Sequence, residues 1–205
     1  MKPSSCGASV RRHRFAAIMD PLNTFAIAPG ALHRLRRRLL AAGPGVAADI
    51  LQDAGFASGE ALHAAWARRV TEQTGLSNAG DLDTAWFGPL LSDLCRDLGW
   101  GSLRTATVAG RAVLLSSADW SEAETGSTEH PGCYFTCGCL AAFLTEEAGA
   151  TLSVLEVECR SSGASHCRFL AGSAETLAVV YDLIAAGGDW RTALPQSELD
   201  DSASA

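Results

Sequence analysis

The segment EVECRSSGASHC, residues 156–167, places a carboxylate and two thiols within a short stretch of chain. Thiolate, imidazole and carboxylate groups are the usual protein ligands of zinc, which takes four of them at tetrahedral corners in a structural site. Cys159 and Cys167 fall at facing ends of a predicted hairpin, so both can reach one point, and Glu156 lies just upstream. The segment therefore predicts most of a metal site, with a disulfide or reduced core cysteines as the alternatives.

A fourth ligand must come from another part of the chain, and Cys133 is the best candidate because it begins a predicted helix. The amide-rich start of a helix favours a thiolate. In a regular strand, however, Glu156 and Cys159 point to opposite faces. Binding by both side chains therefore requires a bulge or a strong twist near Val157–Glu158, and Glu158 replaces Glu156 only if the coil after it turns back.

The seven cysteines of the chain leave other uses of the thiols open. Cys133, Cys137 and Cys139 form a rival set on one predicted helix, although one helix rarely wraps three ligands around a tetrahedron. The odd count and the length argue against a disulfide-stapled miniprotein, and clustered thiols in a reducing compartment are more often metal ligands or inert core residues. His166, beside Cys167, is interpreted either as a group behind the metal ligands or as an exposed turn residue.

The elements that would carry these residues follow from the spacing of apolar residues and from Gly, Pro and Ser at their ends. The predicted order is helices, hairpin, helix, hairpin, helix. This order is typical of an α+β fold with an antiparallel sheet from two hairpins and an N-terminal helical segment, rather than a Rossmann chain. The predicted helices are 29–40, 46–54 ended by Gly55, 58–73 capped by Ser58, 82–98, 133–149 and 173–186, and the predicted hairpins are 102–120, turning at Ala109-Gly110, and 151–159 with 166–172.

The length of 205 residues, of which 47% are hydrophobic, suits one globular domain, with two as the alternative. No apolar run approaches the ~20 residues that span a bilayer, and no secretory signal follows the basic start, so a cytoplasmic protein is predicted. Met19 is a candidate for the true start of the protein. The predicted division is a disordered basic tail over 1–18, an N-terminal helical segment over 19–81, a main domain over 82–190 and a disordered acidic tail over 191–205.

Charge is distributed unevenly along the chain. The first 40 residues carry eight basic side chains and one acid, whereas the whole chain has a net charge of −7, so the remainder carries −14. An acidic body argues against a broad nucleic-acid surface. The basic start is interpreted as a solvated helix face with a tail, the alternative being a contact with an anionic partner.

The longer segment PGCYFTCGCLAAFLTEEAGATLSVLEVECRSSGASHCRF, residues 131–169, resembles the 4-vinyl reductase domain family. The family pattern is a Pro-x-Cys, a helix with small residues, a Gly turn, then Glu-x-x-Cys, a Gly and Cys-x-Phe. DWSEAE (119–124) looks like the Trp-containing segment that precedes this pattern, shortened by several residues. The resemblance covers about 84–187 and is specific over 119–170, so the main domain over 82–190 is identified as a 4-vinyl reductase-like domain.

The resembling family includes bacteriochlorophyll 4-vinyl reductase proteins, free-standing domains and the sensor domains of XylR-type aromatic-responsive activators, and its fold is similar to that of TRAPP subunits. The aromatic sensors bind zinc through three cysteines and a glutamate. The resemblance implies that Trp120 matches a Trp of the phenol sensors' pocket, with a plain core aromatic as the alternative, whereas the His of that pocket has no counterpart here. Matched residue by residue, the implied zinc ligands are Cys133, Glu156, Cys159 and Cys167.

Together these features predict a zinc-braced domain that binds a small apolar or aromatic ligand, in a pocket lined by residues such as Trp86, Phe87, Trp100 and Trp120. Four protein ligands leave zinc no open position for water, and no dinucleotide fingerprint occurs, so the chain is not expected to be an enzyme on its own. The alternative is a bacteriochlorophyll-pathway protein of the 4-vinyl reductase type, acting as a reductase or a tetrapyrrole carrier. Genome context would separate the two hypotheses.

A homodimer is also predicted. The resembling domains commonly pair, and Leu32, Leu35 and Leu39 form an apolar stripe on the first helix. A small sheet has limited inner surface to offer several helices, so the N-terminal segment is the one most easily spared for a second copy. Residues 22–42 are expected at or near the interface, the alternative being that this helix covers its own core.

Overall fold

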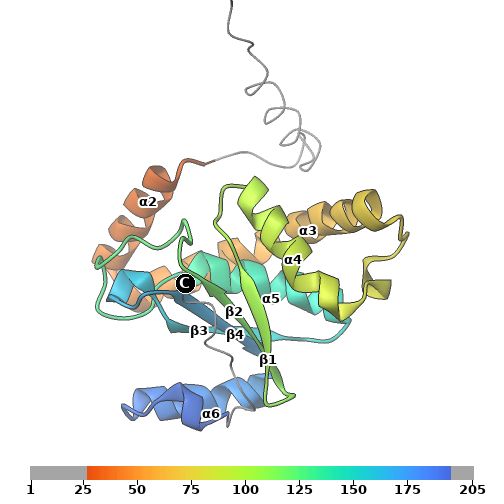
Figure 1. Ribbon diagram of the computed structural model, residues 1–205. Coiled ribbons are helices and arrows are strands. Elements are labelled where there is room, and N and C mark those ends of the chain that lie inside the picture. The colour runs from red at the N-terminus through yellow and green to blue at the C-terminus, as the bar shows by residue number, and fades with distance from the viewer. Residues whose placement is uncertain (1–26, 195–205) are drawn as a thin grey trace, which may run out of the picture.

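A computed structural model describes residues 27–194, and within them helices and one antiparallel sheet form an α+β fold, as predicted (Figure 1). The predicted tail over 1–18 and the part of the acidic tail from 195 onwards lie outside the described residues, as does the candidate start Met19. The helices are α2 (Pro29–Ala42), α3 (Pro44–Thr74), α4 (Thr84–Asp97), α5 (Tyr134–Ala148) and α6 (Ala174–Ala185), and the strands are β1 (Arg104–Val108), β2 (Ala112–Ser117), β3 (Ser153–Glu158) and β4 (Cys167–Gly172).

The two predicted hairpins join into one four-stranded sheet with the order β1-β2-β4-β3, in which every neighbouring pair is antiparallel. The first hairpin turns at Ala109-Gly110, as predicted, and both residues have positive φ, which a type I′ turn requires. β2 pairs with β4 from Ala112↔Gly172 to Ser117↔Cys167. The chain that leaves β2 and the chain that enters β4 therefore lie together at one end of the sheet.

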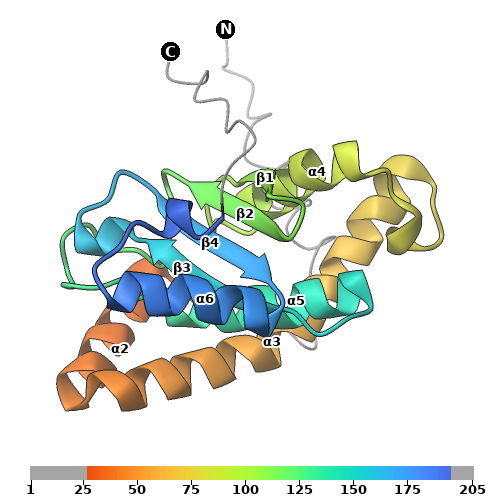
Figure 2. The same cartoon turned by 90° about the horizontal axis from the view of Figure 1, so that it is seen from below.

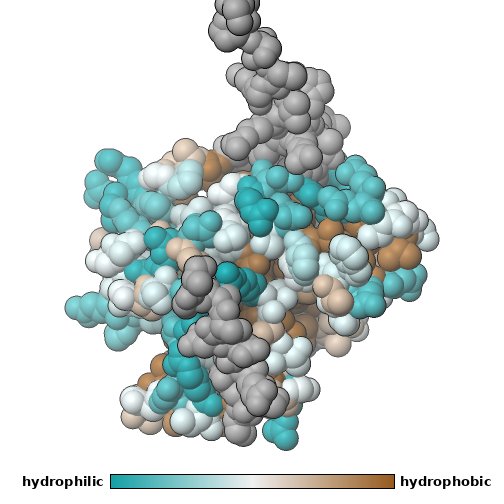
Figure 3. Space-filling model, viewed as in Figure 1, coloured by the Kyte–Doolittle hydropathy of each residue, from teal (hydrophilic) through white to brown (hydrophobic). Residues whose placement is uncertain are grey.

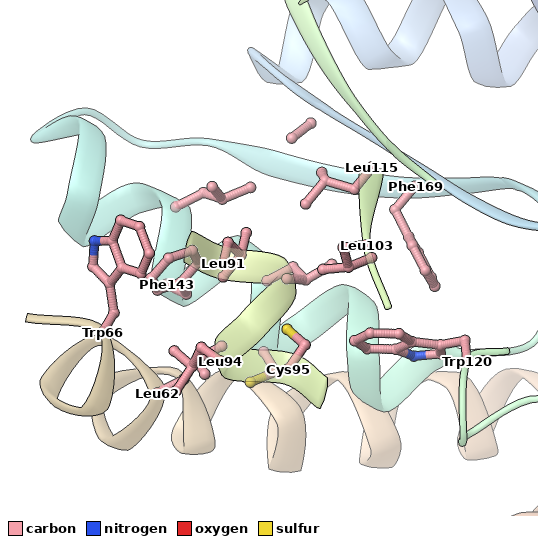
Figure 4. Close-up of a cluster of buried hydrophobic side chains, with 14 of the residues drawn as sticks. Leu62, Trp66, Leu91, Leu94, Cys95, Leu103, Leu115, Trp120, Phe143 and Phe169 are labelled. Atoms are coloured by element: carbon pink, nitrogen blue, oxygen red, sulfur yellow. The ribbon is translucent and has the colours of Figure 1, made fainter. Parts of the chain in front are cut away.

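The sheet separates two apolar cores, and alternate side chains of its strands belong to one or the other. Leu115 and Phe169 pack in the larger core with residues of α3, α4 and α5 (Figure 4). Leu114 and Leu170 pack in the smaller core with residues of α6 and the turn that follows it. Figures 1 and 2 show the resulting layers, with α6 on one side of the sheet and α3, α4 and α5 on the other.

The prediction of two helices over 46–54 and 58–73 is wrong, because both stretches belong to α3, which runs unbroken for 31 residues. Gly55, predicted to end a helix, lies inside α3 against α5, where a Cβ would meet the carbonyl oxygen of Phe135 at 2.0 Å. The glycine therefore serves the close approach of two helices rather than a helix end.

Residues 191–194, predicted as the beginning of the acidic tail, are part of the fold. The short 3₁₀ turn Trp190–Thr192 follows α6, and the side chains of Trp190 and Leu194 are buried in the smaller core with Val157. Trp190, directly before this stretch, and Leu194, at its end, give it a face to bury, which the acidic composition of the tail conceals.

Polar side chains cover much of the face seen in Figure 3, where apolar atoms show over α3 and α4 and around α6. Large exposed apolar side chains are concentrated near the start of the described chain. Those between the first described residue and the middle of α3 are Ile27, Leu35, Val46, Ile50 and Phe56. Within the described residues, no helix combines the length and the apolar character needed to cross a membrane.

Candidate metal centre

Four buried side chains lie together at the end of the sheet where β2 ends and β4 begins. Their ligand atoms lie within 4.8 Å of one another. No other group of this kind occurs within residues 27–194. Cys137 and Cys139, from the rival set, are buried in the larger core and are not part of the group. The structure thus brings together the residues predicted as zinc ligands, which are Cys133, Glu156, Cys159 and Cys167.

Each of these side chains stands at or near the end of an element. Cys133 is the N-cap residue of α5, as the sequence predicts, and Cys167 is the first residue of β4. Cys159 follows β3 and precedes the short 3₁₀ turn Arg160–Ser162. Cys167 is therefore held within a strand, whereas Cys133 and Cys159 stand where a loop meets a helix or a strand.

The strand distortion that the sequence requires is present in β3. The pairing of β3 with β4 shifts between Glu156 and Glu158, and Val157 has no partner in the register. Val157 packs in the smaller core under α6, and the next carboxylate, of Glu158, accepts a hydrogen bond from Trp190 on that same side. Two successive residues on one face mark a β-bulge. The bulge returns Cys159 to the face of Glu156, and Glu158 is engaged elsewhere.

The spacing of the donor atoms fits a zinc ion. Cys133 Sγ and Cys159 Sγ are 3.7 Å apart, close to the ~3.8 Å edge that Zn–S bonds of about 2.3 Å form at a tetrahedral angle and far from the ~2.05 Å of a disulfide. Glu156 Oε2 accepts a hydrogen bond from Cys133 N at 2.7 Å, whereas Oε1 is buried with no hydrogen-bond partner. Such an oxygen is destabilising when left alone, and a cation among the sulfur atoms would satisfy it.

Without a cation, the four buried groups shift one another's pKa values. Burial raises the pKa of Glu156 well above its usual range, and hydrogen bonds with Cys159 and Cys167 raise the pKa of Cys133. Hydrogen bonds from Cys133 and Cys167 lower the pKa of Cys159. Contact with Cys133 lowers the pKa of Cys167, but the contact with Cys159 and burial outweigh it, so that this pKa is raised. Loss of protons from the four groups is therefore coupled: protonation is favoured at Glu156, Cys133 and Cys167, and the thiolate is favoured at Cys159.

A second buried carboxylate, that of Glu122, holds the start of α5 in place. Its oxygen atoms accept hydrogen bonds from Phe135 N at 3.2 Å, from Thr136 N at 2.8 Å and from Thr136 Oγ1 at 2.5 Å. Burial nevertheless raises the pKa of Glu122. Trp120 Nε1 donates to the same Thr136 hydroxyl at 2.7 Å. The loop after β2 thereby satisfies free N–H groups in the first turn of α5 and anchors Cys133.

The four aromatic residues predicted to line a ligand pocket are not all together. Trp100 and the buried Trp120 pack edge to face, with ring centroids 6.0 Å apart. Phe87 instead packs against Trp66, with centroids 5.3 Å apart. Trp86 is 59% exposed, because neighbouring residues of a helix point about 100° apart and Phe87 occupies the inner face. Trp100 and Trp120 therefore lie together, Phe87 packs elsewhere in the core and Trp86 faces solvent, and the role of all four towards a ligand stays a prediction.

Sequence reasoning missed two buried polar residues beside the cluster, Arg36 and Ser161, and it gave Glu122 no role. Glu122 stands eleven residues before Cys133, too far along the chain for the sequence to indicate its contact with the helix start. Arg36 shows no signal either, and the interpretation of the basic start as a solvated face is wrong for this residue, which is 2% exposed. His166 is a half-buried turn residue whose ring contacts the Ser165 hydroxyl.

One protein family model matches part of the chain. Residues 118–173 match the family model of the 4-vinyl reductase domain, and this stretch contains all four clustered side chains. The resemblance to the 4-vinyl reductase domain family is thereby confirmed over those residues. No curated protein matches the chain.

Among solved structures, the chain is similar to the crystal structure of the phenol-responsive sensory domain of the transcription activator PoxR with phenol. The TM-score is 0.58 at 21% identity, over 84% of this chain and 92% of that chain. A vinyl-4-reductase family protein from Methanocaldococcus jannaschii matches with a TM-score of 0.44 at 15% identity, over 82% of this chain and 98% of that chain. The first likeness establishes a shared fold, and the second carries no argument.

Proposed function

We propose that this chain is a zinc-containing domain that binds a small apolar or aromatic molecule. The observation that carries the proposal is the buried cluster of three thiols and one carboxylate, whose sulfur spacing fits a tetrahedral zinc ion and whose free carboxylate oxygen lacks a partner. The match to the 4-vinyl reductase domain, and the fold shared with a phenol-responsive sensory domain, support the ligand-binding part of the proposal.

The proposed zinc is structural, because four protein ligands occupy every tetrahedral position and leave none for water. When bound, the ion would hold the start of α5 to the ends of β3 and β4. The chain itself orients the ligands: Cys133 N donates to Glu156 Oε2, and Ser161 N donates to Cys159 Sγ at 3.3 Å. Such hydrogen bonds fix the direction of ligand side chains before a metal arrives.

The proposed ligand site lies beside Trp120, whose ring packs edge to face against Trp100 and Phe169. Trp120 Nε1 already donates to Thr136 Oγ1, so a ligand at this place meets aromatic rings rather than a free donor. This favours an apolar aromatic ligand over a hydroxylated one. Because Thr136 lies in the first turn of α5, the same helix start serves both the proposed ligand site and the proposed zinc.

The metal content is the first test. We expect purified protein to contain about one zinc per chain, and Cys133→Ala or Cys159→Ala to abolish it, because either change removes one of four ligands. Native mass spectrometry measures the bound metal. The matched controls are Cys137→Ala and Cys139→Ala on α5, which should keep the ion. Wild-type protein without metal, or full retention in a Cys133→Ala/Cys159→Ala double variant, would contradict the assignment.

The ligand class is tested by calorimetric titration of the zinc-loaded protein with apolar monocyclic aromatics, phenols and a tetrapyrrole. We expect the apolar aromatics to bind best, and Trp120→Leu to weaken them roughly two- to tenfold, the equivalent of one aromatic contact. Trp86→Leu on the exposed side of α4 is the control and should leave affinity unchanged. Equal weakening by both substitutions refutes the proposed place, and binding of the tetrapyrrole alone supports the bacteriochlorophyll-pathway alternative.

The homodimer remains a proposal, supported by the exposed apolar side chains of α2 and α3, which include Leu35 and Ile50. Light scattering at micromolar concentration should give twice the chain mass of 21.4 kDa. Leu35→Asp should split the dimer with zinc still bound, because a charge replaces an exposed apolar contact. Val179→Asp, at an exposed apolar residue of α6, is the control and should leave the assembly intact. A wild-type mass of one chain would overturn the proposal.

A further inference from the structure

Arg36 is the only buried residue of α2 within the described chain, although leucines flank it on the helix. Its guanidinium donates from Nη1 to Glu122 O at 2.6 Å and from Nη2 to Ser161 Oγ at 2.8 Å. A buried cation is strongly destabilising unless hydrogen bonds compensate its lost hydration. These two acceptors lie on separate loops, the one before α5 and the one between β3 and β4, so the side chain joins the two loops.

Ser161, the second acceptor, stands directly behind a proposed zinc ligand. The residue is fully buried, and its backbone N donates to Cys159 Sγ. Its hydroxyl accepts from Glu124 N as well as from Arg36, and its carbonyl accepts from Thr128 N. One residue therefore links the guanidinium of α2 to the sulfur atom of the cluster.

Glu122, the first acceptor, connects Arg36 to the start of α5, next to the proposed ligand Cys133. Arg36 binds its carbonyl oxygen, while its carboxylate holds the first turn of α5 that begins after Cys133. Arg36 also packs against the residue before that cysteine, since a Cβ on Gly132 would lie 3.2 Å from Nη2. The guanidinium thus supports both loops on which Cys133 and Cys159 stand.

The rest of α2 strengthens the same contact. His33 Nε2 lies 2.7 Å from Ser121 O. Arg37 forms only an exposed ion pair with Glu124, of a kind that contributes little to stability. Figures 1 and 2 both show α2 at the end of the molecule that holds the loop after β2 and the turn after β3. The helix therefore lies across both ligand-bearing loops, with Arg36 as its buried contact.

We infer that Arg36 is a positioning residue for the metal centre, and that α2 acts as a strap that slows release of the metal. Arg36 does not touch the cluster, and it acts through Ser161 on one ligand and through Glu122 on the other. The inference rests on the proposed zinc. Its physical basis is that a metal leaves stepwise as ligands swing away, so residues that fix the ligand-bearing loops retard the first step.

The test is the rate at which zinc-loaded protein loses zinc to an excess of a chromogenic chelator, well below the melting temperature. We expect Arg36→Met to accelerate release at least tenfold. Arg36→Lys, which keeps the charge but can reach only one acceptor, should fall between Arg36→Met and wild type. Ser161→Ala should accelerate release too, and the effects of Arg36→Met and Ser161→Ala should be non-additive, because they remove the same bond.

Two controls separate positioning from general stability. Arg37→Met removes only the exposed pair with Glu124 and should release zinc like wild type. Arg69→Met removes a buried guanidinium that pairs with Asp97 between α3 and α4, so it should lower the melting temperature while leaving zinc release unchanged. Wild-type release from Arg36→Met, or from Arg36→Lys and Ser161→Ala if Arg36→Met does not fold, overturns the inference, as does fast release from Arg69→Met. Absence of metal from wild-type protein is a separate result that also refutes the proposed function.

Discussion

Removing zinc from the purified protein is expected to lower its melting temperature by roughly 8–16 °C. An ion bound only by the folded state at a thousand times its dissociation constant contributes about 4 kcal/mol, and about 1 kcal/mol shifts the melting temperature of a chain of this length by ~2–4 °C. The ion would tie the start of α5 to β3 and β4, and its loss leaves Glu156 Oε1 buried without a partner. Differential scanning calorimetry before and after chelation measures the change.

The same ion should make stability depend strongly on pH. Unfolded Cys133, Cys159 and Cys167 carry three protons at neutral pH, whereas the zinc-bound ligands carry none, so the unfolded state binds more protons and stability rises with pH. A difference of three bound protons changes the free energy of unfolding by ~4 kcal/mol per pH unit at constant free zinc. This dependence continues until the pH reaches the pKa of an ordinary thiol. In the metal-free protein, the raised pKa of Glu156 favours binding of a proton and the lowered pKa of Cys159 favours loss of one, so the two shifts act in opposite directions. The pH slope of the metal-free protein should therefore be much smaller.

The control for chelation is the Cys133→Ala variant, which should hold no zinc and whose melting temperature the chelator should leave unchanged. This comparison removes any direct effect of the chelator on the protein. An unaltered melt of wild-type protein after verified loss of zinc would refute the structural role of the ion, and equal pH slopes with and without zinc would refute thiolate ligation.

The second large effect is expected at the contact of α3 with α5. In Gly55→Ala the new Cβ would lie 2.0 Å from the carbonyl oxygen of Phe135 and 3.0 Å from Cys139 N, both of them backbone atoms that cannot swing aside. The helices must separate, which disrupts the larger core, and we expect a loss of about 3 kcal/mol or more in the free energy of unfolding. Gly138→Ala on the facing helix should behave alike, since its Cβ would lie 2.0 Å from Gln52 O.

Gly45→Ala, on the same helix, is the matched control, because a Cβ there would meet nothing within 4 Å. It should leave stability unchanged or raise it by about 0.5–1 kcal/mol, since alanine restricts the unfolded chain. Urea unfolding followed by circular dichroism measures all three variants. Wild-type stability of Gly55→Ala would show that α3 and α5 do not approach as closely as the structure places them.

The sequence by itself determined the features that depend on near neighbours in the chain. Alternating apolar residues and the turn at Ala109-Gly110 predict the first hairpin, and Ser173 predicts the start of α6, where its hydroxyl accepts from Thr176 N. The metal cluster was predictable because the spacing of its three cysteines and one glutamate matches the pattern of the 4-vinyl reductase domain family. The bulge in β3 then followed from geometry, since Glu156 and Cys159 cannot otherwise share a face.

Only the tertiary structure decided features that depend on residues far apart in the sequence. Gly55 has the local character of a helix end, and only the approach of α5 shows why it continues a helix. Arg36 has the local character of a solvated residue, yet acceptors on two distant loops provide the hydrogen bonds that allow its burial. Trp86 and Phe87 are neighbouring aromatic residues, and packing against Trp66 selects Phe87 for the inner face of α4. In each case the local sequence permits several environments, and the free energy of a long-range contact selects among them.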